Sequence, residues 1–207
     1  MQPLFSPRHG PAALLLAALW LGAATGAAGQ PVDAEKLVKV HAAFLLNFVR
    51  LTTWPPPEPG AGGGPKPLRV LVAGDPALAS ALEAVLRGRL VHGRPVAVTS
   101  LSFPDAPPTP TLIGRLTARL ADADALVLGA VPDPWRAPLA HALREGPEPA
   151  RPRLLVTRER WGVDARFAHL AFTVRDGRVA FLLSVSALEA SPLRLSSKLL
   201  ALAERLP

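Results

Sequence analysis

Histidine is the side chain in this sequence best suited to bind a metal or to transfer protons, and five histidines are present. A metal site on a helix places two of them four residues apart, so that both face the same side. No pair here has that spacing. The five are His9, His41, His92, His141 and His169. The sequence therefore predicts no metal site.

Other side chains could supply a nucleophile or an acid-base pair. No serine stands in a Gly-x-Ser-x-Gly turn, which would present its hydroxyl at a strand-to-helix junction. Ser196 and Ser197 precede Lys198, but the Ser-x-x-Lys spacing is missing, and a serine that starts a helix is typical of an N-cap. Asp122 and Asp124 are explained more simply as the polar end of a helix that meets a strand. We expect no enzymatic activity.

Two glycine-containing segments could hold a phosphate group. The glycines of residues 60–64 precede a predicted strand, whereas a phosphate-binding loop follows a strand and opens a helix, so this segment is a linker. Gly74-Asp75-Pro76 does lie between a strand and a helix. It lacks the Gly-x-Gly-x-x-Gly spacing of dinucleotide sites, and Asp75 is explained as a helix cap. We expect no cofactor.

The elements that position these side chains alternate between strands and helices. Continuous apolar runs predict buried strands, and Asp-Pro pairs followed by spaced leucines predict helices. The strands are expected over 68–73, 95–101, 125–128 and 153–156, and the helices over 32–52, from Asp75-Pro76 to Gly88, over 112–120, and from Asp133-Pro134 to Gly146. This order predicts right-handed crossovers and a mostly parallel sheet.

The last third of the chain departs from this alternation. Segments 168–174 and 178–184 flank Arg175-Asp176-Gly177, a turn that predicts an antiparallel hairpin. A final helix is expected to carry Leu195, Leu199, Leu202 and Leu206. The fold class is therefore α/β: a three-layer α/β/α sandwich with a mostly parallel sheet, a C-terminal antiparallel hairpin and a final helix.

Topology predicts one candidate binding site. In open parallel sheets, ligands bind outside the carboxyl ends of the strands. Gly74, Asp75, Gly129 and Arg158 each follow a predicted strand, and Trp161 lies just beyond the last of them. We expect this edge to form a groove for a partner or a small ligand.

Aromatic residues of the first helix are a second candidate. Phe44 and Phe48 lie on a wide apolar arc that extends from Leu37 to Leu51, and Trp54 follows it. Burial beneath the sheet explains this arc, with self-association or partner binding as the alternatives. Trp54 either covers the edge of the core or contacts a partner, because tryptophan suits both places.

The N-terminal segment indicates export. Residues 1–29 have one arginine, an apolar run and a small-residue tail, which is the layout of a signal peptide cleaved near Ala28 or Gly29. An uncleaved anchor is the alternative. Residues 30–207 are then expected to form a single domain with a Pro/Gly-rich loop at 55–67. The chain has no cysteine, so its stability must come from its core.

The net charge of +7 is spread along the chain without a basic run. An exported protein rarely meets nucleic acid, so we expect no nucleic-acid partner. A basic face directed at an acidic partner remains an alternative.

Two segments near the chain ends carry a resemblance. Residues 41–55 contain Ala-Phe-Leu-x-x-Phe and end in Trp-Pro, and residues 193–200 read Leu-x-Leu-Ser-Ser-Lys-Leu-Leu. Between them lie Gly74-Asp75 after an apolar strand and a hairpin that bears Phe172 and Phe181. In this order, the chain resembles the YfiR-like family of exported bacterial regulators.

The resemblance implies a periplasmic, non-enzymatic regulator. Its best-known members bind the periplasmic domain of an inner-membrane diguanylate cyclase and repress it, which lowers cyclic di-GMP and biofilm formation; others are linked with sensor kinases, and many are dimers. The sequence departs from the family pattern at His41, Ser184 and Pro192, where Lys, Asn and Gly are usual. The alternative function is a periplasmic small-molecule sensor module that acts with a histidine kinase.

Overall fold

The computed structural model describes residues 34–54, 56, 64–145, 153–158, 168–175 and 177–205. The predicted signal peptide, Trp161 and most of the loop at 55–67 lie outside these residues. Contacts divide the chain into Met1–Pro31 and Val32–Pro207, and all described residues belong to the second unit. Within the described ranges, no helix combines the length and the apolar character that crossing a bilayer requires.

Eight of the described strands form a mostly parallel sheet with the order β10-β8-β7-β6-β5-β2-β4-β3. Its members are β2 (Leu68–Ala73), β3 (Leu90–Val91), β4 (Arg94–Leu101), β5 (Ala125–Leu128), β6 (Leu154–Thr157), β7 (Leu170–Arg175), β8 (Arg178–Leu183) and β10 (Glu204–Arg205). Strands β4, β2, β5, β6 and β7 run parallel, while β7 and β8 form an antiparallel hairpin. The predicted α/β class and the hairpin are confirmed.

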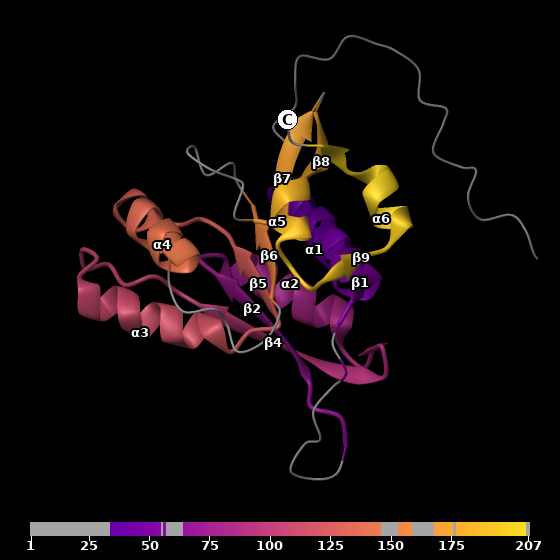
Figure 1. The fold of residues 1–207 in the computed structure, drawn as a ribbon, viewed down its shortest axis with the longest axis horizontal. Helices are drawn as coiled ribbons and strands as arrows, with labels where there is room; N and C mark the ends of the chain where they lie inside the picture. The colour runs from indigo at the N-terminus through magenta and orange to yellow at the C-terminus, as the bar shows by residue number, and fades with distance from the viewer. Residues whose placement is uncertain are drawn as a thin grey trace, which may run out of the picture. The chain divides into compact units, whose positions relative to one another are not determined.

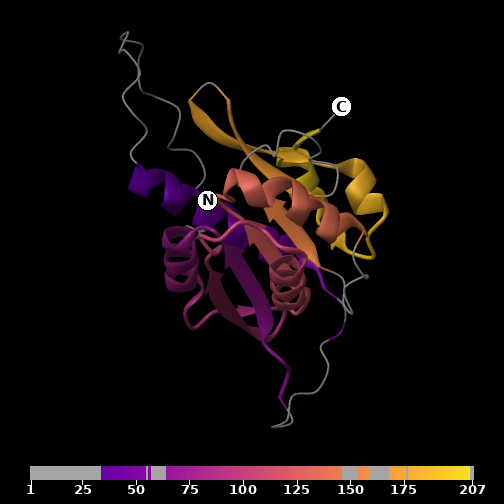
Figure 2. The same ribbon diagram turned by 90° about the vertical axis from the view of Figure 1, so that its left-hand side faces the viewer.

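Helices cover both faces of this sheet (Figures 1 and 2). Helices α1 (Ala34–Leu51) and α2 (Pro76–Leu86) pack on one face, and α3 (Pro110–Ala121) and α4 (Asp133–Glu145) on the other. Strand β2 shows why: Val70 and Val72 join the core beneath α1 and α2, whereas Leu71 and Ala73 join the core beneath α3 and α4. Alternate residues of a strand face opposite sides, so a continuous apolar run serves two cores.

Helix α1 is held by aromatic packing against the hairpin. Phe48 is fully buried, and its ring stacks on Phe172 at 5.5 Å and meets Phe181 edge-on at 4.8 Å between centroids. Ala42 and Leu45 are buried as well, and their three-residue spacing with Phe48 places all three on the same face of the helix. The centre of the apolar arc is therefore buried beneath the sheet, whereas Leu37, Phe44 and Leu51 are half-buried.

The end of the chain differs from the expected long helix. Leu195 lies in β9 (Arg194–Leu195), which pairs antiparallel with β1 (Thr52–Thr53). Ser196 then caps a short helix, α6 (Ser197–Leu202), after another short helix, α5 (Val185–Glu189). The prediction that Leu195 belongs to the helix was wrong, because Ser196 N donates to Leu51 O at 2.8 Å and holds this segment extended. Leu206 lies outside the described residues.

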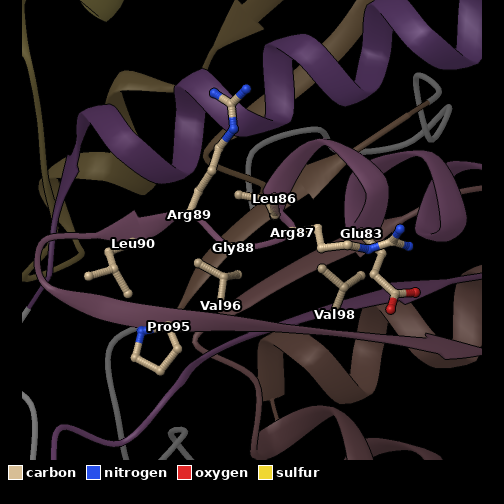
Figure 3. Close-up of a pocket in the computed structure, with 9 residues that line it drawn as sticks. All are labelled: Glu83, Leu86, Arg87, Gly88, Arg89, Leu90, Pro95, Val96 and Val98. Carbon is tan, nitrogen blue, oxygen red and sulfur yellow. The ribbon is translucent and has the colours of Figure 1, made fainter.

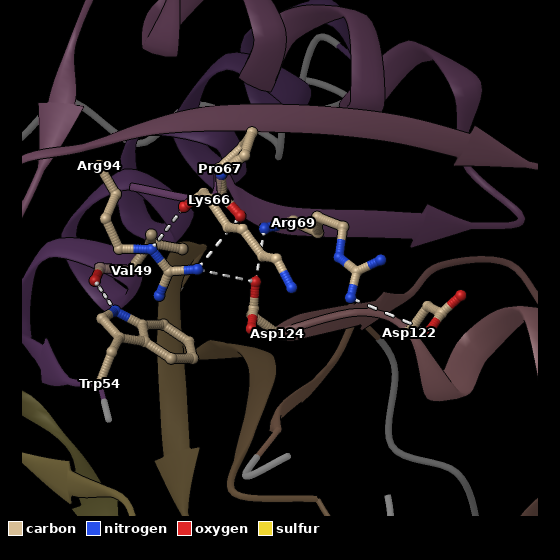
Figure 4. A network of polar contacts seen from close by, with 8 residues as sticks. All are labelled: Val49, Trp54, Lys66, Pro67, Arg69, Arg94, Asp122 and Asp124. Carbon is tan, nitrogen blue, oxygen red and sulfur yellow. Dashed lines mark hydrogen bonds and ion pairs between the residues drawn. The ribbon is translucent and has the colours of Figure 1, made fainter. Parts of the chain in front are cut away.

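A buried ion pair joins the amino ends of three strands (Figure 4). The Arg94 guanidinium lies 3.4 Å from Asp124 Oδ2, and the two side chains are only 5% and 7% exposed. Arg94 also donates to the carbonyls of Lys66 at 3.0 Å and Pro67 at 3.1 Å, and Asp124 Oδ2 accepts from Arg69 N at 2.7 Å. Asp124 is therefore a structural carboxylate whose charge is balanced where it is buried.

Replacing Arg94 with alanine tests this pair. We expect Arg94→Ala to lower the free energy of unfolding by about 3–5 kcal/mol, because Asp124 stays buried without its counter-charge. The control is Asp122→Asn, which removes an exposed contact of 3.9 Å with Arg69 and should cost less than about 1 kcal/mol. Urea unfolding of both variants provides the measurement, and equal losses would contradict the assigned role.

Candidate binding site at the carboxyl ends of the strands

The structure brings together most of the residues predicted at the strand ends. Strands β2, β5 and β6 are adjacent and parallel, so the residues that follow them meet at one edge of the sheet. Gly74 and Asp75 follow β2, Gly129 follows β5, and Arg158 follows β6. Trp161 lies outside the described residues.

Asp75 and Arg158 form the centre of this edge. Arg158 Nη1 donates to Asp75 Oδ2, and the side chains are 24% and 6% exposed. Asp75 Oδ1 accepts from Leu78 N at 2.9 Å, which caps α2 as the sequence predicts. Arg158 N donates to Leu128 O at 2.8 Å, so the backbone of Arg158 is held as well. The Asp75 carboxylate thus caps α2 and also pairs with Arg158, which follows another strand of the sheet, β6.

Two glycines allow the backbone segments that follow β2 and β5 to lie close together. A Cβ at Gly129 would lie 2.5 Å from Asp75 Cβ, which no real structure tolerates. Gly74 has a φ of +77°, and a Cβ there would lie 2.3 Å from Ala130 O. The Gly-Asp pair is therefore explained by close backbone packing and by the left-handed conformation that glycine adopts freely.

His41 completes the cluster, and sequence reasoning did not place it there. It lies on α1, is 4% exposed, and its ring is 4.4 Å from that of Phe172 between centroids. Burial lowers the pKa of His41 from 6.5 to about 4; the Arg158 guanidinium acts in the same direction, and the Asp75 carboxylate opposes them. The only available signal was that His41 occupies a position where the resembling family usually has Lys.

Two buried polar atoms at this edge have no hydrogen-bond partner among the described residues. They are His41 Nδ1 and Thr157 Oγ1, and Thr157 directly precedes Arg158. Buried polar atoms are nearly always hydrogen-bonded, so each exception requires an explanation. For His41, a small polar ligand on the α1 face is one such explanation. Thr157 follows Val156 in β6 and therefore faces the opposite side of the sheet, so it does not share that ligand.

Of the aromatic candidates, Phe44 and Phe48 pack on Phe172, the same ring that His41 contacts. Phe44 is half-buried and its ring lies 5.7 Å from that of Phe181, whereas Phe48 has no exposed surface. Trp54 is half-buried against the α1 core, and its Nε1 donates to Val49 O at 2.9 Å (Figure 4). Trp54 therefore lies at the edge of the core, which is the first of the two places predicted for it. Phe48 is buried and stabilises the fold, so it does not form a contact surface.

A separate pocket of about 300 Å³ lies between the end of α2 and the β3–β4 edge of the sheet (Figure 3). Its walls combine apolar and charged side chains. They are Glu83, Leu86, Arg87, Gly88, Arg89, Leu90, Pro95, Val96 and Val98. Sequence reasoning missed this pocket because it predicted neither the short strand β3 nor its turn.

The buried histidines make stability depend on pH. His169 is also buried, its Nδ1 accepts from Leu155 N at 3.0 Å, and burial and Arg153 lower its pKa to about 4. Between pH 6.5 and about 4, the unfolded chain binds protons that the folded chain does not. We therefore expect stability to be highest above pH 6.5 and to fall by up to about 3 kcal/mol per histidine on acidification. If the free energy of unfolding, measured with urea, did not change across this pH range, the expected pH dependence would be contradicted.

The neighbours of His41 should shift its titration in opposite directions. We expect Arg158→Gln to raise the pKa of His41 and Asp75→Asn to lower it further, since each variant removes one charge that acts on the ring. NMR titration of the His41 ring provides the measurement. The exposed His141 serves as an internal reference, and shifts in the same direction for both variants would contradict the geometry.

The segments that carried the family resemblance lie side by side. Thr52 pairs with Leu195 and Thr53 with Arg194, so the end of the first segment and the start of the last form one small sheet. No curated protein matches the chain significantly. The family model described as DUF4154, YfiR/HmsC-like, matches residues 38–204, which include both segments and the strand-end cluster. The chain belongs to the YfiR/HmsC-like family.

Proposed function

We propose that this chain is an exported regulator that binds the periplasmic domain of an inner-membrane diguanylate cyclase and represses the cyclase. The match to the YfiR/HmsC-like family over residues 38–204 carries the proposal, because members of this family are generally non-enzymatic periplasmic regulators of such cyclases. A sensor kinase with a periplasmic domain is the alternative partner.

Repression requires the chain to bind one state of its partner more tightly than the other. A ligand shifts a two-state equilibrium only by its differential affinity, and each tenfold shift takes about 1.4 kcal/mol. A few additional hydrogen bonds or a small apolar contact in the inactive state are sufficient. The regulator therefore needs a rigid contact surface and no reacting groups.

Export is part of the proposal. We propose that residues 1–29 are a signal peptide cleaved near Ala28 or Gly29, and that residues 30–207 act as a single domain. The chain has no cysteine, so an oxidising compartment cannot change its covalent structure through disulfides.

A specific observation supports a second candidate function, a small-molecule sensor module that acts with a histidine kinase. His41 Nδ1 is buried on the α1 face without a partner among the described residues, near the sheet edge where open α/β folds bind ligands. The Arg158 guanidinium acts electrostatically on the His41 ring and is partly exposed, so it could attract an anionic group.

Binding of the mature chain to the periplasmic domain of a membrane diguanylate cyclase from the same organism tests the main proposal. We expect a stable complex by calorimetry, and an N-terminus of the secreted chain near residue 29 by mass spectrometry. Export with no affinity for any such cyclase or kinase domain would contradict the proposed function.

Thermal shifts test the second candidate. If a small anionic metabolite occupies the strand-end cluster, it should raise the melting temperature of the wild type but not of Arg158→Gln. Arg178→Gln, which changes an exposed arginine on the hairpin, is the matched control. Equal shifts for all three proteins would exclude this cluster as the ligand site.

A further inference from the structure

We propose that the open edge of β4 binds an extended, acidic segment of a partner protein as an additional strand of the sheet. This inference deepens the proposed function, and it rests on that function for one premise, that the chain binds a partner protein. It concerns a different surface from the strand-end cluster.

Strand β4 is paired on one side along its length and on the other side only at its start. Val96 to Leu101 pair in parallel with Leu68 to Ala73 of β2. On the outer side, β3 pairs with Arg94 and Pro95 alone. Within the described part of the chain, no strand covers this side beyond Pro95.

The register shows which backbone groups point outward. Gly74 N donates to Leu101 O at 2.8 Å, so Leu101 faces β2. Because successive residues of a strand direct their backbone groups to opposite sides, Val96, Val98 and Ser100 direct theirs to the open edge. These groups are free to pair with another strand.

The edge also lacks the usual protection against pairing. Natural edge strands carry charges, prolines or bulges that block a second strand. The residues from Val96 to Leu101 read Val-Ala-Val-Thr-Ser-Leu, with no charge and no proline. Ala97, Thr99 and Ser100 are exposed. An unprotected edge of this kind is suited to strand addition.

The pocket beside α2 lies along the same edge (Figure 3). Val96 and Val98 are half-buried, face the α2 core and line the pocket. Side chains of an added strand would lie next to them on the same face of the sheet. Alternate side chains of that strand would therefore enter the pocket and determine which sequence binds.

Charge favours a partner over a second copy of this chain. Arg87 and Arg89 are exposed at the pocket, with Glu83 as the one carboxylate among its lining residues. The β4 strand of a second copy contains no carboxylate to offer these arginines. An extended segment with acidic residues complements them, so we infer a partner of that composition.

A proline at an outward-facing position tests the inference. Ser100→Pro removes an amide that points to the open edge and leaves the β2 ladder intact, and Ser100→Ala is the matched control that keeps the amide. The probe is a fluorescent, end-capped peptide, Glu-Val-Thr-Val-Thr-Val-Glu. We expect Ser100→Pro to weaken its binding about tenfold and Ser100→Ala by less than about twofold.

A second variant, Arg87→Gln, tests whether the positive charge at the pocket contributes to binding, and it leaves β4 unchanged. Arg87→Gln should weaken binding of the same peptide about threefold. A peptide with Lys in place of Glu should bind the wild type more weakly than the acidic one. Unchanged binding by Ser100→Pro, or equal binding of the two peptides, would overturn the inference.

The remaining outcomes separate this inference from the proposed function. If the cyclase domain binds the wild type and Ser100→Pro equally well, the edge inference fails and the proposed function stands. If the acidic peptide binds as expected but no cyclase domain binds the wild type, the proposed function fails and the edge inference stands. If light scattering shows a wild-type dimer that Ser100→Pro dissociates, the occupant is a second copy and the inference is overturned.

Discussion

Packing of Phe48 between Phe172 and Phe181 is the contact on which the fold depends most. It joins the first helix to the C-terminal hairpin, so segments from opposite ends of the chain share one core. A chain without cysteines has no covalent means of holding these segments together, and buried apolar area must do so. Pairing of β1 with β9 joins the end of the first helix to the C-terminal part of the chain as well. The two family segments are therefore first of all structural, and the function must lie on surfaces that this core supports.

The amino and carboxyl ends of the parallel strands are held by two different networks of ion pairs and hydrogen bonds. At the amino ends, Arg94 and Asp124 form a buried pair with several backbone partners, which fixes the start of β4 relative to β2 and β5. At the carboxyl ends, Asp75 caps α2 and pairs with Arg158, and His41 lies beside them in its neutral form. The first network, around Arg94 and Asp124, is buried from solvent. The second is partly exposed and includes a ring nitrogen without a partner among the described residues, so a polar ligand would find an available hydrogen-bonding group at that end.

The sequence predicted those parts of the fold that are determined by interactions between residues close together in the chain. The apolar run at Leu68–Ala73 and the Asp75-Pro76 cap were readable because burial on two faces and helix capping act within a few residues. Strands β1, β3 and β9 were not readable, since strands of two residues exist only where a distant partner supplies hydrogen bonds. The same reason explains the error at Leu195, whose helical spacing was overridden by pairing. Of the candidate site, Asp75, Arg158 and Gly129 were predicted from topology, whereas the role of His41 required the three-dimensional docking of α1.

Cyclic di-GMP measured in spheroplasts tests the central claim most directly, because their periplasmic face is open to added protein. The cells should express the membrane diguanylate cyclase and lack the gene for this chain. The account predicts that adding the purified mature chain lowers cyclic di-GMP in proportion to occupancy, and that heat-denatured chain has no effect. Unchanged cyclic di-GMP in the presence of saturating folded chain would contradict it.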